Sequence, residues 1–308
     1  MNRFYYYIFL FFLLLFKNTS FWFLYRVSDL LYLFLLYVLK YRKKVVISNL
    51  RESFPEKSDE EVQRITRAFY KHLCDISVEG VKTFSLRKKD ILKRYILLNP
   101  ELLEPCFKTK QSVIAVLGHF NNWEWGSLAA GIFFKHKPVG FYQPLSNPYI
   151  DNYIQTTRAK EGMVLESVSR TSQTFHRLKK TPYMFIMVAD QSPMNLKLAY
   201  WIPFLHHDTA VLHGTEKHAV KNNYPVFFAD VQKVKRGHYT ATMELLEANP
   251  AETQPGEITL KFMQRLEQQI RAKPEYWLWS HRRWKHSRDE GRRTRDEGRR
   301  KKDVRRET

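Results

Sequence analysis

Residues 113–124 read VIAVLGHFNNWE, and this stretch is the clearest indication of the fold in the sequence. Val113–Leu117 is an unbroken run of β-branched and aliphatic residues, which predicts a buried strand. Gly118 then allows a sharp turn, because glycine reaches backbone conformations that other residues avoid. Asn121 and Asn122 can both act as helix caps, so a helix is expected from Trp123 onwards. A strand, a turn and a helix in this order are a common setting for binding sites in α/β folds.

Two side chains in the same stretch could carry out acid–base chemistry. His119 falls on the predicted turn and Glu124 in the first turn of the predicted helix, a spacing of H-x4-E. The carboxylate could therefore reach one imidazole nitrogen, and a base oriented by a carboxylate is the arrangement that removes a proton from a hydroxyl. The spacing alone equally fits a structural histidine and a glutamate that stabilises the N-terminus of a helix. The choice between the two interpretations depends on the rest of the chain.

The body of the chain predicts an α/β fold with a mixed central sheet flanked by helices. Residues 45–110 are expected to be helical, because Ser58 and Glu61 form a capping box ahead of apolar residues at helical spacing. The last two predicted strands are expected to pair as a hairpin through Arg236-Gly237. Strands are predicted over residues 113–117, 138–142, 183–189, 226–234 and 239–246. Helices are predicted over residues 123–134, 150–160, 172–179, 215–221 and 257–272.

Residues 1–44 have the composition of a membrane anchor. Residues 4–16 carry no charge, and residues 21–39 are apolar apart from two charged residues and one serine. Because a span needs about 20 predominantly apolar residues, we expect a helix pair or one span with an interfacial helix. The basic run at residues 40–44 indicates, by the positive-inside rule, that the domain at residues 45–286 lies on the cytoplasmic side. A cleaved signal peptide is the alternative, but no small-residue cleavage site follows the first run.

The chain of 308 residues carries a formal net charge of +20, which fits a partner with phosphates. Nucleic acid, an anionic membrane surface and an anionic lipid all meet this condition. Residues 287–308 form a charged tail in which RDEGRR occurs twice, and its lack of apolar residues predicts disorder. Cys74 and Cys106 form no C-x-x-C pair, which suits a reducing compartment; a disulfide between the two is the alternative. No phosphate-binding loop or strong metal-ligand spacing is present, so neither a cofactor nor a metal is expected.

Several short segments occur in the order in which one known family carries them. They are the N-terminal anchor, NLRESFP at 49–55, GHFNNWE at 118–124, YQP at 142–144 with Asn147, Arg158 with Gly162, DQ at 190–191, WIPF at 201–204 and PEYWLWSHRRW at 274–284. Across residues 1–286 the chain resembles the bacterial lipid A secondary acyltransferases of the lauroyl/myristoyl type, whose fold is glycerolipid-acyltransferase-like. Two positions depart from that family. Asn121 stands where the family usually has glycine, and Phe204-Leu205-His206 where it usually has F-F-G.

The resemblance implies transfer of a fatty acyl chain from acyl carrier protein to a hydroxyl of a lipid A precursor at the cytoplasmic face of the inner membrane. His119 would act as the general base toward the β-hydroxyl of a hydroxyacyl chain. Glu124 would hold its tautomer and stabilise the imidazolium that forms. Asn122 and backbone N–H groups at the start of the helix are candidates for stabilising the oxyanion.

Five further residues are candidate substrate-binding groups. Arg158 would lie near the acyl-transfer centre or a substrate phosphate, because a guanidinium suits either; an ordinary surface arginine is the alternative. Asp190, followed by Gln191, ends a predicted strand and could reach the same rim of the sheet as the imidazole, although a turn residue would show the same pattern. Arg282 and Arg283 lie among tryptophans and could bind phosphates near the membrane, while the tryptophans themselves fit a core or an interface.

Two other functions are compatible with parts of the sequence. The acceptor could be a lysophospholipid or an aminolipid, because H-x4-[DE] chemistry is shared across glycerolipid acyltransferases. A non-enzymatic, membrane-tethered protein that binds nucleic acid would rest on the positive charge alone, which is the least specific of these signals. We therefore expect an acyltransferase whose partners are a thioester donor, a lipid acceptor and membrane lipids, with no nucleic acid.

Overall fold

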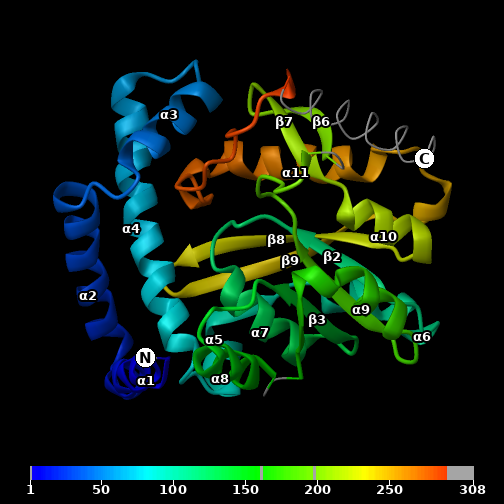
Figure 1. Cartoon of the computed structure of the whole chain (residues 1–308), viewed down its shortest axis with the longest axis horizontal. Helices are drawn as coiled ribbons and strands as arrows, with labels where there is room; N and C mark the ends of the chain where they lie inside the picture. The colour runs from blue at the N-terminus through cyan, green and yellow to red at the C-terminus, as the bar shows by residue number, and fades with distance from the viewer. Residues whose placement is uncertain (1, 160–161, 197–198, 290–308) are drawn as a thin grey trace, which may run out of the picture.

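The computed structural model describes residues 2–159, 162–196 and 199–289, and its centre is a mixed sheet with helices on both faces (Figure 1). This is the α/β class that the sequence predicted. Seven strands form the sheet in the order β1-β9-β8-β2-β5-β3-β4, and β6 and β7 form a separate hairpin. The strands are β1 Tyr95–Leu97, β2 Val113–Leu117, β3 Lys137–Tyr142, β4 Val164–Ser167, β5 Tyr183–Val188, β6 Ala199–Phe204, β7 His207–Leu212, β8 Val226–Lys235 and β9 His238–Glu247.

The helix α4 starts at the predicted capping box, because Ser58 accepts from the Glu61 backbone and Glu61 accepts from the Ser58 backbone. It runs across one end of the sheet (Figure 1). The helices are α1 Asn2–Lys17, α2 Phe21–Leu33, α3 Lys43–Ser53, α4 Asp59–Thr83, α5 Lys88–Arg94, α6 Glu104–Lys108, α7 Trp123–Phe133, α8 Pro148–Ala159, α9 Thr171–Arg177, α10 Gly214–Asn222 and α11 Glu257–Ala272. Shorter helical turns are η1 Phe34–Val38, η2 Pro100–Leu103, η3 Val168–Arg170, η5 Pro250–Glu252 and η6 Pro274–Tyr276.

The central strand β2 pairs in parallel with β5 on one side and with β8 on the other. β5 continues in parallel through β3 to β4, whereas β8 and β9 form the antiparallel hairpin that the sequence predicted. The register of β2 and β5 places Leu117 opposite Val188, so both strands end at the same edge. Loops that follow neighbouring parallel strands meet at this edge, which is where α/β folds bind ligands.

Alternate residues of β2 belong to two different cores, as expected for a strand that is buried on both faces. Ile114 and Val116 pack in the core that includes α11. Val113 and Ala115 pack in the core that includes α7. The two helices therefore cover opposite faces of the sheet, and the residues that follow β2 are held between two packed layers (Figure 1).

The N-terminal helices α1 and α2 lie beside α4 (Figure 1). Among the described residues, Phe21–Val38 is the one helical segment long and apolar enough to cross a membrane, as judged by length and composition. Leu24 and Ser28 are buried, whereas Trp22 and Leu30 are 68% and 69% exposed. α2 therefore has one side that packs on the protein and another that exposes large apolar side chains.

The five predicted strands are all present, but four further strands were not predicted. β1 interrupts the region 45–110 that was expected to be helical, because its three residues are held by pairing with β9 rather than by a local pattern. β4, a strand of four residues, lies at the other edge of the sheet. The β6–β7 hairpin packs outside the main sheet. Of the charged tail predicted over 287–308, residues 290–308 lie outside the part that the structure describes.

Candidate active site

The carboxyl ends of β2 and β5 bring together two residues that are far apart in the sequence. His119 follows β2 by one turn residue, and Asp190 follows β5 by one residue. Because the two strands are parallel neighbours in register, the residues meet at the same edge of the sheet. The prediction that Asp190 could reach the same rim as the imidazole agrees with this arrangement.

The carboxylate of Asp190 holds His119 by two contacts. The Nδ1 atom of His119 lies 2.6 Å from Oδ1 of Asp190, and the backbone N–H of His119 donates to Oδ2 at 2.8 Å. The indole N–H of Trp277 donates to the same Oδ2 at 2.8 Å. An ionised carboxylate only accepts hydrogen bonds, so Nδ1 carries the proton and Nε2 keeps its lone pair. The side-chain nitrogen of Gln191 lies 3.2 Å from Nε2, where it can donate to that lone pair.

The electrostatics of the pair support the same assignment. Burial of the imidazole disfavours its charged form, but the charge and hydrogen bond of Asp190 outweigh burial and raise the pKa of His119. Burial also opposes ionisation of Asp190, yet the charge of His119 and the donors around the carboxyl lower its pKa to about 2. Asp190 is therefore ionised at neutral pH, and His119 is a stronger base than a free imidazole.

Glu124 does not make the predicted contact with His119. The Nδ1 atom of the imidazole is bonded to Asp190, while the carboxylate of Glu124 forms an ion pair with Arg158 from α8. The H-x4-E spacing identified two side chains that are close in the sequence. The carboxylate that bonds the imidazole instead comes from Asp190, which follows the neighbouring strand β5. Glu124 remains close enough for its negative charge to add to the raised pKa of His119. The expected hydrogen bond between Glu124 and the imidazole is thus replaced by two separate pairs.

In the turn at residues 118–122, the residue with the unusual backbone conformation is not the predicted glycine. Asn121, and not Gly118, adopts the left-handed conformation, with φ of 54°. Glycine is favoured at such a position, which accounts for the glycine that the resembling family has there. Gly118 is instead required for close approach, because a Cβ atom would lie 2.7 Å from Leu266 and 3.2 Å from Asp190.

The C-terminal segment holds this turn from the other side. The backbone N–H of Asn121 donates to the carbonyl of Tyr276, and Phe120 forms an isolated β-bridge with Trp277. Trp277 is buried and also bonds Asp190, so one residue braces both the turn and the carboxylate. No spacing in the sequence pointed to this role, although Trp277 lies within the PEYWLWSHRRW motif.

The side chain of Asn122 makes hydrogen bonds within the protein. Asn122 does not line the cavity beside His119 that is described below. Its side-chain oxygen caps α7 by accepting from the Trp125 backbone N–H at 2.9 Å. Its side-chain nitrogen donates to Glu79 at 2.7 Å. Both polar groups are therefore occupied within the protein, so the role predicted for this side chain in stabilising the oxyanion is not supported by its orientation.

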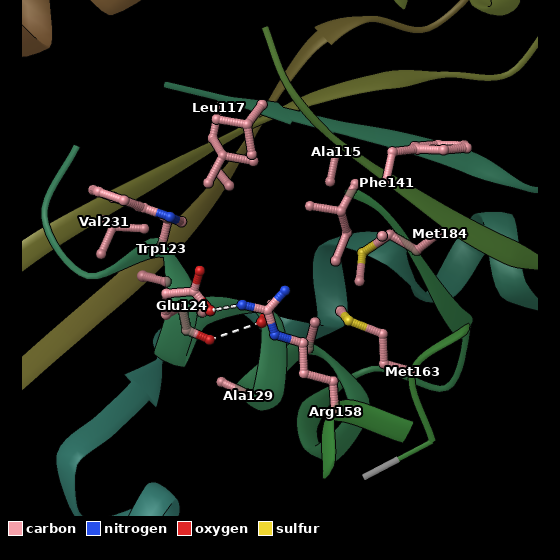
Figure 2. Close-up of a pocket in the computed structure, with 18 of the residues that line it drawn as sticks. Ala115, Leu117, Trp123, Glu124, Ala129, Phe141, Arg158, Met163, Met184 and Val231 are labelled. Carbon is pink, nitrogen blue, oxygen red and sulfur yellow. Dashed lines mark hydrogen bonds and ion pairs between the residues drawn. The ribbon is translucent and has the colours of Figure 1, made fainter. Parts of the chain in front are cut away.

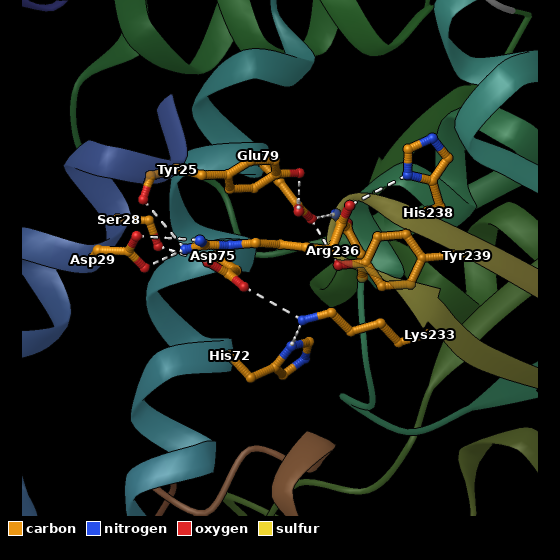
Figure 3. A network of polar contacts seen from close by, with 11 residues as sticks. Tyr25, Ser28, Asp29, His72, Asp75, Glu79, Lys233, Arg236, His238 and Tyr239 are labelled. Carbon is orange, nitrogen blue, oxygen red and sulfur yellow. Dashed lines mark hydrogen bonds and ion pairs between the residues drawn. The ribbon is translucent and has the colours of Figure 1, made fainter. Parts of the chain in front are cut away.

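Glu79 is a buried carboxylate that joins the N-terminal helices to the turn at 118–122. Besides Asn122, it accepts from the hydroxyls of Tyr25 on α2 and Tyr239 on β9, each at 2.8 Å (Figure 3). Burial raises the pKa of Glu79, and the three donors oppose this shift. No sequence motif pointed to Glu79, because its partners come from three elements that are distant in the chain.

A second buried carboxylate, Asp75, lies one helical turn before Glu79 on α4. It accepts from Ser28 at 2.7 Å and forms ion pairs with Lys233 and Arg236 of the β8–β9 hairpin (Figure 3). Arg236 also pairs with Asp29 on α2 at 2.7 Å. The polar side of α2 is therefore fixed to α4 and to the hairpin by charged groups.

A cavity of about 390 Å³ opens beside His119, and we call it the main cavity. Its walls come from the sheet on one side and from α7 on the other (Figure 2). Most of the lining is apolar, including Leu117, Ala129, Met163 and Met184. Polar side chains also line it, and four of them lie together and form what we call its polar end: His119, Glu124, Arg158 and Gln191. A cavity with this lining suits an apolar chain whose reactive end lies at the imidazole.

The sequence profile of the bacterial lipid A biosynthesis acyltransferases matches residues 1–286. The chain belongs to this family. No curated protein sequence matches it significantly. The family makes the protein an acyltransferase of lipid A biosynthesis, and the apolar cavity with a base at its polar end is consistent with acyl transfer.

Two arginines predicted to bind substrate in this acyltransferase have different environments. Arg282 is exposed, whereas Arg283 is only 2% exposed and donates to the Ala210 carbonyl at 2.8 Å. Burial lowers the pKa of Arg283 to about 10, against the opposing effect of the Asp190 charge. Arg283 is therefore a buried cation. This burial does not agree with the prediction that Arg283 binds phosphates near the membrane.

The neighbouring His281 also serves the fold of the acyltransferase. Its Nε2 atom accepts from the Ser192 backbone N–H at 3.2 Å. Burial lowers the pKa of His281 to about 4, so the ring is neutral and able to accept. Across residues 2–159, 162–196 and 199–289, no group of three or more His, Cys, Asp or Glu side chains could hold a metal ion.

Proposed function

We propose that this acyltransferase moves a fatty acyl chain from the thioester of acyl carrier protein to a hydroxyl of a lipid A precursor, as a secondary acyltransferase. The observation that carries the proposal is the position of His119, whose Nδ1 is bonded to Asp190 while the ring lines an apolar cavity. A base in the lining of a cavity that suits an acyl chain fits transfer from a thioester to a hydroxyl. The family membership of the chain supports the lipid A precursor as acceptor.

In the proposed reaction, Nε2 of His119 takes the proton from the acceptor hydroxyl as its oxygen attacks the thioester carbonyl carbon. The hydroxyl would replace the amide of Gln191, which lies 3.2 Å from Nε2. The tetrahedral intermediate then breaks its carbon–sulfur bond, and the leaving sulfur takes the proton back from Nε2. An ester and a thiol are the products. Asp190 orients the ring and stabilises the imidazolium between the two proton transfers.

Arg158 and Glu124 are proposed to act as a pair at the polar end of the main cavity. Of the described residues that line this cavity, Arg158 is the one with a permanent positive charge. A guanidinium near the thioester carbonyl would stabilise the negative oxygen of the tetrahedral intermediate. Glu124 would hold that guanidinium in place through their ion pair and add negative charge near the imidazolium.

We also propose that α1 and α2 attach the protein to the cytoplasmic face of the inner membrane. α2 exposes large apolar side chains on the side that does not pack on α4, and the segment Phe21–Val38 is long enough to span. The basic residues 40–44 follow directly, as expected for the cytoplasmic end of a membrane segment. Fractionation of cells that express the full chain and a variant lacking residues 2–38 tests this proposal. A truncated protein that stays fully membrane-bound would contradict it.

The reaction is tested by offering wild-type protein in detergent a panel of donors and acceptors. The donors are acyl carrier protein and coenzyme A thioesters of several chain lengths. The acceptors are a tetra-acylated lipid A precursor, a lysophospholipid and an aminolipid. The expected result is one added acyl chain on the lipid A precursor, with acyl carrier protein as the better donor, and no product from His119→Ala. If product forms on the lysophospholipid or the aminolipid but not on the lipid A precursor, the proposed acceptor is wrong.

A further inference from the structure

A groove of about 400 Å³ lies on the other side of the residues that close the main cavity, and we call it the α4 groove. One wall is the outward face of α4. The opposite wall comes from residues 121–124, Arg158 and Leu278. The groove-lining residues from α4 and its C-terminal cap are mostly apolar or small: Leu73, Ile76, Ser77, Gly80, Val81, Thr83 and Phe84. None of these side chains is part of the proposed chemistry.

The α4 groove and the main cavity share three lining residues, Trp123, Glu124 and Arg158. The Glu124–Arg158 ion pair and the Trp123 ring therefore form a wall common to both spaces. The ring of Trp123 also contacts the imidazole of His119, with centroids 5.0 Å apart. A molecule in the α4 groove would thus contact residues that also border the reactive centre of the main cavity.

The α4 groove also borders the N-terminal apolar helices. Phe84, at its far end, packs against Phe9 of α1 with ring centroids 5.9 Å apart. α1 exposes Phe4, Tyr7 and Phe11 by more than half of their surfaces. The α4 groove therefore lies next to a helix that exposes large apolar side chains.

One polar residue in the lining of the α4 groove has unused hydrogen-bonding capacity. Asn121 lines the groove and is fully buried, and its side-chain oxygen has no partner among the described residues. Its side-chain nitrogen is occupied, because it donates to the Val231 carbonyl at 2.7 Å. A buried acceptor without a partner is costly, and a donor from a bound molecule would satisfy it.

We propose that the α4 groove binds the hydrocarbon chain of the acyl acceptor, and that a hydroxyl or amide N–H of the acceptor bonds the side-chain oxygen of Asn121. This inference rests on the proposed function. A reaction between two lipid-like substrates needs two apolar sites that meet at the base, and the main cavity supplies one. The donor chain arrives on a soluble carrier, whereas the acceptor is a membrane lipid. The groove beside α1 therefore suits the acceptor, and the main cavity suits the donor.

Substitution of Gly80 fills the α4 groove without disturbing the packed interior. A Cβ atom at Gly80 would have no heavy atom within 4 Å, and alanine or leucine is a better helix former than glycine. The series Gly80→Ala and Gly80→Leu adds increasing volume, and Gln63→Leu adds an apolar side chain elsewhere on α4 as a matched control. We expect Gly80→Leu to raise the KM for the lipid A precursor by about tenfold or more. The KM for the thioester donor should stay unchanged, and the melting temperature should not fall.

A binding measurement separates this inference from the proposed reaction. A tetra-acylated lipid A precursor with a diazirine in a hydroxyacyl chain is cross-linked to wild-type protein without any donor, and the labelled peptides are mapped. Labels on residues 73–84 that disappear in Gly80→Leu support the inference even if no transfer occurs. Labels confined to residues 126–134 of the main cavity, or an unchanged acceptor KM in an active Gly80→Leu, would overturn it. Absence of transfer by wild type would instead refute the proposed reaction.

Discussion

The Nδ1 atom of His119 lies 2.6 Å from Oδ1 of Asp190, although the two residues are 71 positions apart in the chain. The contact depends on two parallel strands that end together, and Trp277 and the His119 backbone hold the carboxylate in place. This geometry makes Asp190 a positioning residue for the proposed base. Its removal should therefore affect the chemical step more than the binding of either substrate.

The first prediction concerns Asp190→Asn. The amide cannot hold the imidazole in the same tautomer or stabilise the imidazolium, so kcat should fall by about 10²–10⁴-fold with little change in either KM. His119→Ala should lose at least as much activity. Steady-state kinetics with saturating donor and acceptor measure the effect. The exposed Asp289→Asn serves as the control and should behave as wild type.

The second prediction concerns pH. Since His119 must be unprotonated to act as a base and Asp190 raises its pKa, kcat/KM should fall on acidification with a midpoint above about 6.5, the ordinary pKa of histidine. Without the negative charge at position 190, the pKa of the imidazole drops. The residual activity of Asp190→Asn should therefore have its midpoint at lower pH. A midpoint that stays at the wild-type pH would argue against direct coupling of the two groups.

The third prediction is that Glu124 and Arg158 act as one unit. Glu124→Ala and Arg158→Ala should each lower kcat/KM, and the double variant should lose little more than either single one. A coupling energy of about 1–3 kcal/mol is expected for such a pair in contact. The ion pair Glu166–Arg177, whose residues do not line the main cavity, supplies a control cycle in which no effect on activity is expected. Additive losses at Glu124 and Arg158 would mean that the two residues have independent roles.

The fourth prediction concerns the buried Glu79, which links Tyr25 of α2 to the cap of α7 through Asn122. Glu79→Leu would leave three buried donors without an acceptor and should reduce the free energy of unfolding by about 3–5 kcal/mol. Tyr25→Phe removes one donor and should cost about 1 kcal/mol. Thermal unfolding in detergent measures both, with the exposed Tyr5→Phe as the control.

The fifth prediction concerns chain length. Ala129 lines the main cavity on the α7 side, so Ala129→Leu should reduce the space available to an acyl chain (Figure 2). Each methylene that no longer fits loses about 0.8 kcal/mol of burial, and the preferred donor should become shorter. Competition between thioesters of different lengths reveals the change. The exposed Ala251→Leu should keep the wild-type preference, and an unchanged preference in Ala129→Leu would remove the main cavity from chain selection.

Local sequence patterns were sufficient to predict the helices and strands around the site. The run Val113–Leu117 predicted β2, and the polar turn after it predicted the position of His119 and the start of α7. The capping box at Ser58 predicted the start of α4, and Arg236-Gly237 predicted the hairpin. Each of these features depends on residues within a few positions of one another, where spacing and side-chain type determine the backbone.

The partners within the site were decided by the tertiary structure. The sequence determined that His119 would stand on a turn at the end of a buried strand, and it offered Glu124 as the nearest carboxylate. In the structure, His119 instead contacts Asp190, because β5 pairs with β2 in parallel. Glu124 forms an ion pair with Arg158, which lies on α8. Strand order and register depend on how whole layers pack, and no spacing along the chain encodes the distance between side chains on different strands. For the same reason the three contacts of Glu79, from α2, α7 and β9, appear only in the folded chain.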